Sequence, residues 1–177
     1  MSISKYILLC FLTIVSAFDY SLEDLNPSSE HIGQFVGPSV FSGEVTLHYF
    51  GHFSWGLCSA RFGQLNDFYN DLLLLGYDQI KLIGIGKNQH INAISNWTNG
   101  NDASVVVDSL LNENPTWSEW GAGQRELFIL DHVGELVFSE NISSTDAQGN
   151  QWAGGVPSAI QNMIVSLIND IPDTSKW

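Results

Sequence analysis

Between residues 44 and 85, two short apolar segments flank one long amphipathic segment, and this order constrains the fold more than any other feature. Residues 44–50 (EVTLHYF) are rich in β-branched and aromatic side chains, which predicts a strand. Over 58–72 the apolar residues recur every three or four positions, which predicts a helix that Gly76 ends. Residues 79–85 form a second apolar run, typical of a strand covered on both faces. Two such strands joined by a helix lie parallel in one sheet.

Further apolar segments follow and complete one domain. The expected elements are a short helix and loop at 86–100, a short strand at 105–107, a helical turn at 115–122, strands at 126–130 and 135–139, and a helix at 156–168. The last two strands are joined by a four-residue turn, which predicts a hairpin. Because no internal repeat is present, the order strand–helix–strand, insert, strand–strand–helix predicts a single α/β domain.

The first 17 residues have the features of a secretory signal peptide. Lys5 precedes an apolar run at 7–15, and residues 15–17 (VSA) supply the small side chains that a signal peptidase reads, so we expect cleavage after Ala17. The run is too short to span a bilayer, and no later apolar run is long enough. The sequence therefore predicts a secreted protein, extracellular or periplasmic, without an integral membrane segment.

Composition divides the remaining chain into three parts. Residues 18–43 are rich in Ser, Pro, Gly and acidic side chains, which predicts an irregular N-terminal segment. The folded domain is expected at 44–170, and residues 171–177 are expected to form a C-terminal tail. The sequence gives no indication of the oligomeric state.

The chain is strongly acidic, with 19 Asp and Glu against 6 Lys and Arg and a formal net charge of −13. This charge repels nucleic-acid phosphate and anionic membrane surfaces, and no basic cluster offsets it. Cys10 lies in the predicted signal peptide, so cleavage leaves one cysteine, Cys58. In an oxidising compartment a single cysteine is inert and buried, paired with another molecule, or chemically employed.

Two tripeptides match the acceptor pattern for N-glycosylation. They begin at Asn96 (NWT) and Asn141 (NIS), whereas the proline after Asn26 spoils a third. If the protein passes through a eukaryotic secretory pathway, both sites are candidates for glycans. Such tripeptides also arise by chance, so both readings stay open.

The junction between the first strand and the first helix reads HYFGHFSWGLC over 48–58, and two later segments can be compared with known sequence motifs. These are 76–80 (GYDQI) at the entry to the second strand and 127–137 (LFILDHVGELV) in the hairpin. Together, in this order, they resemble the thioredoxin-like (redoxin) superfamily, in particular the N-terminal domain of selenoprotein P. The resemblance covers residues 45–140. It implies a thioredoxin-like three-layer sandwich, βαβ then ββα, around a mixed central sheet.

Proteins of this kind carry a C-x-x-C or U-x-x-C pair, U being selenocysteine, where the first strand runs into the helix. Trp55-Gly56-Leu57-Cys58 occupies that place, so the resemblance puts Trp55 at the attacking position and Cys58 at the resolving position. The positive end of a helix stabilises a thiolate, which makes the first group a nucleophile. The second group, one turn further, attacks the mixed disulfide and releases the product.

Two departures from the family pattern stand out. Trp55 cannot form a bond with Cys58, and Gln124-Arg125 stands where the family has a cis-proline before the hairpin. One hypothesis is that codon 55 is UGA, which encodes selenocysteine in the organism; the other is a true tryptophan. The periodicity of the helix also places Cys58 on its buried face, so an inert thiol is an open alternative.

These observations predict a secreted thiol/selenol oxidoreductase that reduces small disulfides or peroxides, or exchanges with protein disulfides. An external thiol, either a small molecule such as glutathione or a protein such as thioredoxin, would recycle it, and no cofactor is expected. The alternative is a redox-inactive binding module on the same fold. His52 and Arg125 are candidates to bind substrate or to tune an anionic charge, and ordinary solvent-facing roles are the alternative for both.

The other motifs give weaker indications of a functional site. His48, His52 and Cys58 lack further ligands at zinc spacing, so no metal is expected. Ser54 precedes the first helix and is a candidate to cap it. Four tryptophans form either core or a stacking surface for a ligand: Trp97, Trp117, Trp120 and Trp152.

Overall fold

The computed structural model describes residues 18–109, 113–143 and 152–173. The predicted signal peptide and residues 174–177 of the predicted tail lie outside them. A five-stranded mixed sheet has the order β5-β4-β3-β6-β7. The strands are β3 (Val45–Gly51), β4 (Ile80–Lys87), β5 (Ser104–Asp108), β6 (Glu126–Leu130) and β7 (Leu136–Asn141). The three strands β3, β4 and β5 are parallel, whereas β6 is antiparallel to both β3 and β7.

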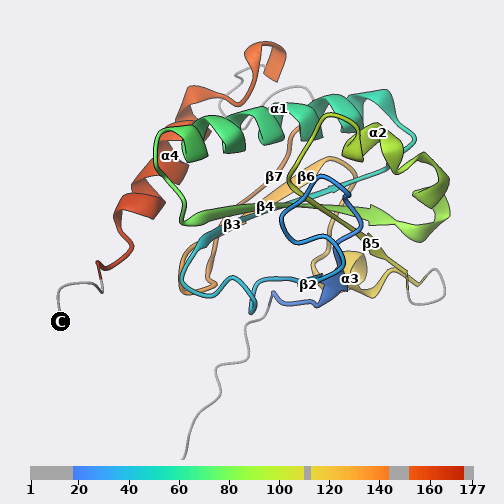
Figure 1. Ribbon diagram of the computed structural model, residues 1–177, viewed down its shortest axis with the longest axis horizontal. Helices are drawn as coiled ribbons and strands as arrows, with labels where there is room; N and C mark the ends of the chain where they lie inside the picture. Colours follow the sequence, from blue (N-terminus) through green and yellow to red (C-terminus); the bar gives the residue numbers. More distant parts are fainter. Residues whose placement is uncertain (1–17, 110–112, 144–151, 174–177) are drawn as a thin grey trace, which may run out of the picture.

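Helices cover both faces of this sheet, which confirms the predicted three-layer α/β architecture. The helical elements are α1 (Gly56–Leu74), the 3-10 helix η1 (Asn88–Ala93), α2 (Ser95–Thr98), α3 (Pro115–Glu119), the 3-10 turn η3 (Trp152–Gly154) and α4 (Ser158–Asn169). Figure 1 shows α1 and α4 on one side of the sheet, and α3 together with the N-terminal segment on the other. No helix in the described part of the chain is long and apolar enough to cross a bilayer.

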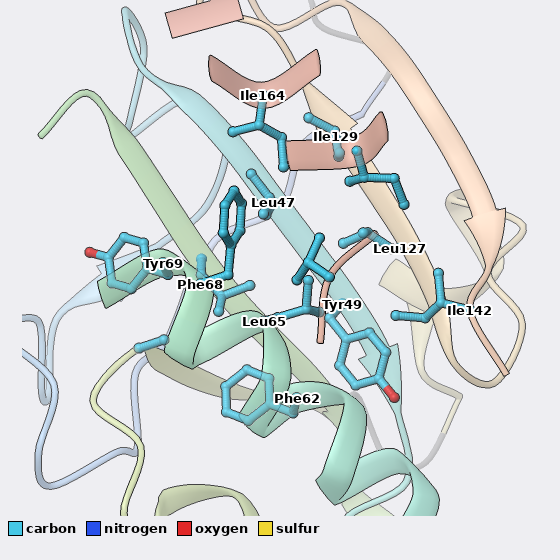
Figure 2. Packing of buried hydrophobic residues seen from close by; sticks show 14 of the residues in the cluster. Leu47, Tyr49, Phe62, Leu65, Phe68, Tyr69, Leu127, Ile129, Ile142 and Ile164 are labelled. Carbon is cyan, nitrogen blue, oxygen red and sulfur yellow. The ribbon is translucent and has the colours of Figure 1, made fainter. Parts of the chain in front are cut away.

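The larger half of the core lies between the sheet and the helices α1 and α4. Figure 2 shows Phe62 and Leu65 of α1 packed over Tyr49 of β3, with Ile164 of α4 beside Ile129 of β6. These side chains are almost completely buried, and burying each contributes about 1.5–3 kcal/mol to folding. The three- and four-residue spacing that predicted α1 therefore marks the face that packs on the sheet.

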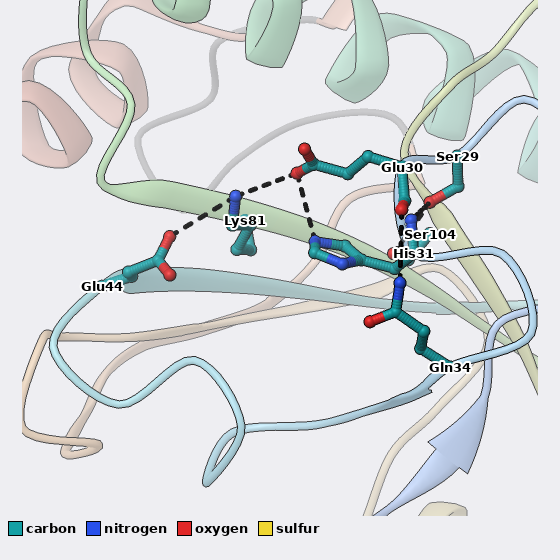
Figure 3. A network of polar contacts seen from close by, with 7 residues as sticks. All are labelled: Ser29, Glu30, His31, Gln34, Glu44, Lys81 and Ser104. Carbon is teal, nitrogen blue, oxygen red and sulfur yellow. Dashed lines mark hydrogen bonds and ion pairs between the residues drawn. The ribbon is translucent and has the colours of Figure 1, made fainter.

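The N-terminal segment is more ordered than its composition predicted. It contains a two-residue antiparallel pair, β1 (Leu22–Glu23) with β2 (Phe35–Val36). Asp24 anchors it to β5, since its carboxylate accepts a hydrogen bond from the Val105 amide at 3.0 Å. At the other end of the sheet Lys81 of β4 forms ion pairs with Glu30 at 3.0 Å and Glu44 at 3.6 Å (Figure 3). The segment thus covers the face opposite α1.

The boundaries of several elements differ from the prediction. Helix α1 begins at Gly56 rather than at residue 58, and Gly76, with φ +88°, follows its last turn in the left-handed conformation as expected. Strand β4 continues to Lys87, because Gly86 and Lys87 pair with β5. The residues after it form η1 and α2 instead of one helix and a loop. The hairpin of β6 and β7 is confirmed.

Candidate active site

The proposed pair of positions lies where the central strand β3 enters α1. Four residues, 52–55, separate β3 from α1; the last, Trp55, is the N-cap residue of α1 in an extended conformation, and Cys58 lies in the first turn. The Ser59 amide donates to the Trp55 carbonyl at 3.1 Å, so the two positions are one helical turn apart. The Trp55 side chain is 51% exposed and that of Cys58 is fully buried. An accessible position therefore precedes an enclosed thiol.

The loop before α1 is fixed mainly by Phe53. Its ring is fully buried and makes an edge-on contact with Trp97, with ring centroids 4.9 Å apart. The carbonyl of Phe53 also accepts a hydrogen bond from the Asn96 amide at 2.9 Å. These contacts hold residue 55 at the start of the helix.

The capping role expected for Ser54 is wrong. Its hydroxyl lies 3.3 Å from Nδ1 of His90, and no side chain caps α1. The N-cap is Trp55, which carries no hydrogen-bond acceptor on its side chain. The first turn of α1 also has no acidic residue, so its positive end is not compensated from within the helix.

Two side chains from the loop before β6 approach the sulfur of Cys58. Gln124 Nε2 lies 3.5 Å from Sγ, and Arg125 Nη1 lies 3.9 Å from it. From the opposite side the Tyr49 hydroxyl donates to the Cys58 carbonyl at 3.2 Å. Burial, above all, raises the pKa of Tyr49 well above its usual value, which keeps this phenol a donor. The buried thiol therefore has polar neighbours.

Arg125 is held in this position by its backbone as well as its side chain. Its φ of +63° lies in the left-handed region, which is unfavourable for a residue with a Cβ. Its amide donates to the Phe50 carbonyl, and its own carbonyl accepts from the Ile142 amide, both at 2.8 Å. Nε donates to the Ser143 hydroxyl at 2.7 Å. The loop before β6 thus presents a guanidinium to the thiol.

His52 is half-buried on the other side of residue 55. Its ring centroid lies 5.7 Å from that of Trp55 and 4.3 Å from that of His90. Burial, together with the nearby His90, Lys87 and Arg125, lowers the pKa of His52 to about 4. The Lys87 ammonium lies 4.2 Å above the ring of Trp117. The structure therefore brings His52 and Arg125 together with positions 55 and 58.

The remaining candidates separate from this site. His48 is fully buried, with Nδ1 2.8 Å from the Tyr20 hydroxyl and Nε2 2.8 Å from the Thr46 hydroxyl. Within the described residues no three His, Cys, Asp or Glu side chains are grouped to hold a metal ion. The four tryptophans considered as a stacking surface are buried in the core: Trp97, Trp117, Trp120 and Trp152.

The two glycosylation candidates flank the loops of the site. Asn96 lies on α2 and Asn141 ends β7, and both side chains are exposed. The side-chain amide of Asn141 donates to the Gln124 carbonyl at 2.8 Å, and the side-chain amide of Asn96 donates to the Phe53 carbonyl. Their modification stays a prediction.

Sequence reasoning missed Gln124 as a neighbour of Cys58. It noted the residue only because a proline was absent, and no local pattern marks an amide that contacts a sulfur 66 residues away. Lys87 was missed as well. The signal for it was its position at the end of a parallel strand, where the carboxyl ends of neighbouring strands gather.

No protein-family profile matches this chain, and no curated protein matches it in sequence. Solved structures do resemble it. The thioredoxin domain of a thiol-disulfide oxidoreductase from Bacteroides vulgatus matches with a TM-score of 0.60 and 15% identity over 88% of this chain and 96% of that one. DsbF from MTB matches with a TM-score of 0.60 and 11% identity over 90% and 100%. A thioredoxin-like protein from Bacteroides vulgatus matches with a TM-score of 0.61 and 15% identity over 87% of each chain. The chain has the thioredoxin-like fold.

Proposed function

We propose that this protein is a secreted thiol/selenol oxidoreductase in which residue 55 attacks the substrate and Cys58 resolves the intermediate. The observation that carries the proposal is the pair itself, an exposed position before α1 and a buried thiol one turn later. A structural neighbour named as a thiol-disulfide oxidoreductase supports disulfides as the substrate class. The predicted signal peptide supports export.

In the proposed reaction, a selenolate or thiolate at residue 55 attacks one sulfur of a disulfide. The S–S bond breaks, one substrate thiolate leaves, and a mixed bond forms. The Cys58 thiolate then attacks residue 55, forms the 55–58 bond and releases the second thiolate. The substrate has gained two electrons and the pair has lost two, which two molecules of an external thiol return. With a peroxide, the selenolate attacks one oxygen, so the O–O bond breaks, a Se–OH bond forms and the alkoxide leaves and takes up a proton as the alcohol. The Cys58 thiolate then forms the 55–58 bond and displaces hydroxide, which leaves as water.

The proposal requires that residue 55 is selenocysteine in the natural protein. The surroundings of Trp55 support this, since half of its side chain is exposed and its ring contact is with His52 at 5.7 Å. The buried clusters do not include it. Mass spectrometry of the natural protein identifies residue 55 directly, because selenium has a characteristic isotope pattern. A tryptophan at this position, encoded by UGG, would end the selenocysteine hypothesis.

The geometry is tested separately with Trp55→Cys. We expect the two cysteines of this variant, at 55 and 58, to form an intramolecular disulfide under mild oxidation and to catalyse reduction of small disulfides with an external thiol. Trp55→Ser is the matched control, because it removes the indole without supplying a nucleophile, and it should be inactive. A folded Trp55→Cys variant that keeps two free thiols after oxidation would refute the proposed pairing.

A redox-inactive binding module is the second candidate, and one observation favours it. Trp55 and Leu57 are 51% and 44% exposed at the start of α1, and exposed apolar groups at a loop are typical of contact surfaces. In this case residue 55 is a genuine tryptophan and Cys58 stays a thiol under oxidation. The mass spectrum of the natural protein thus distinguishes the two functions.

A further inference from the structure

We infer that the site takes small anionic substrates, in which a carboxylate or similar group lies near the disulfide or peroxide. This rests on the proposed function and adds the substrate class to it. The structural basis is the positive charge near the pair: Arg125 lies 3.9 Å from Cys58 Sγ, and the start of α1 is uncapped. Lys87 lies over Trp117, whose ring centroid is 5.8 Å from that of His52, the ring neighbour of residue 55. The rest of the chain is poor in cations, so this grouping is unusual for the molecule.

The distribution of positive charge is uneven. The described residues contain four Lys and Arg side chains, and three of them interact with the site: Arg61, Lys87 and Arg125. Arg61 is only 8% exposed and donates to the carbonyls of Ile142 and Ser143, so its role is structural. Lys87 and Arg125 remain as partly exposed cations.

Neither of these cations has an ion-pair partner among the described carboxylates. In contrast, Lys81 at the opposite end of the same strand β4 binds Glu30 and Glu44 (Figure 3). Asp108 pairs with Lys87 in the register of β4 and β5, yet its carboxylate accepts instead from the Trp117 amide at 3.0 Å. Burial raises the pKa of Asp108. Among the described residues Lys87 therefore forms no ion pair, and the Asp108 carboxylate beside it is directed at the Trp117 amide.

The start of α1 adds to the positive potential. Its 19 residues align their peptide dipoles toward residue 55, and neither a capping side chain nor an acidic residue offsets them in the first turn. The start of α1, Lys87 at the end of β4 and Arg125 in the loop before β6 therefore all favour a negatively charged ligand. A neutral substrate gains nothing from this arrangement.

The charge of the whole molecule indicates the size of the expected substrate. With a net charge of −13, the chain repels an acidic protein that approaches over a broad surface. A small anion meets mainly the groups within a Debye length, about 8–10 Å at moderate salt. The local cations therefore decide the binding of a small anion. We exclude an acidic macromolecule as the preferred substrate on this ground.

The test uses a single thiol at the attacking position, in the double variant Trp55→Cys with Cys58→Ser. Its reaction rate is measured with the anionic disulfide 5,5′-dithiobis(2-nitrobenzoate) and with the neutral disulfide 4,4′-dithiodipyridine. In each case the thiolate breaks the reagent's S–S bond and releases a coloured thiol. For the protein and for free cysteine, the rate with the anionic reagent is divided by the rate with the neutral one, and the protein's ratio is then divided by that of cysteine. We expect this normalised ratio to be about ten at low salt and to fall toward one at 0.5 M salt.

Lys87→Gln and Arg125→Gln should each lower this ratio about threefold, whereas the matched control Lys81→Gln should leave it unchanged. Circular dichroism confirms that each variant is folded. A ratio near one in the parent, or an equal effect of Lys81→Gln, would overturn the inference. The ratio requires no 55–58 bond, so it is independent of the oxidation test of Trp55→Cys. Failure of one test leaves the other interpretable.

Discussion

Replacing Gly86 by alanine should disturb the fold where it supports the site. Gly86 lies in β4 under the ring of Phe53. A Cβ at Gly86 would lie 2.0 Å from Cζ and 2.3 Å from Cε2 of that ring, far inside van der Waals contact. Because the ring is rigid and fully buried, Phe53 must leave its position, and the loop before residue 55 must move with it.

The expected cost follows from this displacement. Overpacking of a core costs about 1–3 kcal/mol, and exposing a phenylalanine costs about 1.5–3 kcal/mol. Since the ring can keep part of its burial, we expect Gly86→Ala to lower the free energy of unfolding by about 2–3 kcal/mol. With a urea m-value of about 2 kcal/mol/M, the midpoint falls by about 1–1.5 M. In the Trp55→Cys background, the 55–58 disulfide should also form more slowly.

Gly63→Ala is the matched control, because it makes the same chemical change in the middle of α1. The atom nearest to its Cβ outside the helix backbone is Oδ1 of Asn101, at 3.9 Å, so there is room. Alanine should stabilise this helical position by about 0.5–1 kcal/mol. Equal urea midpoints for Gly86→Ala and the parent would refute the packing argument for Phe53.

Three further results are expected. Burial lowers the pKa of His48 to about 3. Since the unfolded chain takes up this proton near pH 6.5, the free energy of unfolding should fall by about 1.4 kcal/mol per pH unit between about pH 6.5 and 3. An NMR signal of the His48 imidazole that titrates near 6.5 in the folded protein would contradict this. Cys58 is fully buried, so iodoacetamide should modify it at least about 100-fold more slowly in the native protein than in denaturant; equal rates would show an accessible thiol. After secretion from eukaryotic cells, Asn96→Gln and Asn141→Gln should each remove one glycosidase-sensitive mass increment, and an unchanged mass would show an unused sequon.

The sequence predicted those elements whose side-chain pattern is determined by burial. Strand β3, helix α1 and the hairpin of β6 and β7 were found because their apolar residues face the sheet or the core at a fixed period. The region 86–100 was not resolved in this way. There η1 and α2 are short; η1 has no buried residue and α2 has two, Trp97 and Thr98, too few to define a period.

The site was predictable in part for the same reason. Positions 55 and 58 follow from the end of one strand and the beginning of the helix, both visible along the chain. The approach of Arg125 to Cys58 was not, because it depends on the register of β6 against β3 and on a left-handed backbone at Arg125 itself. Neither has a local signature, since arginine is not a residue that favours positive φ.

The polar groups around Cys58 bear on whether its thiol is inert. A structural thiol is satisfied by apolar neighbours, and a guanidinium is costly to bring near an enclosed site unless it has partners there. Arg125 nevertheless adopts a conformation that costs about 1–2 kcal/mol for a residue with a Cβ, although glycine would adopt it freely. Unlike glycine, arginine places a positive charge near Sγ of Cys58, and its hydrogen bond to Ser143 holds that charge in position. In the proposed reaction Cys58 attacks as a thiolate, and this charge would stabilise that anion. The contact therefore supports the proposed function over an inert thiol.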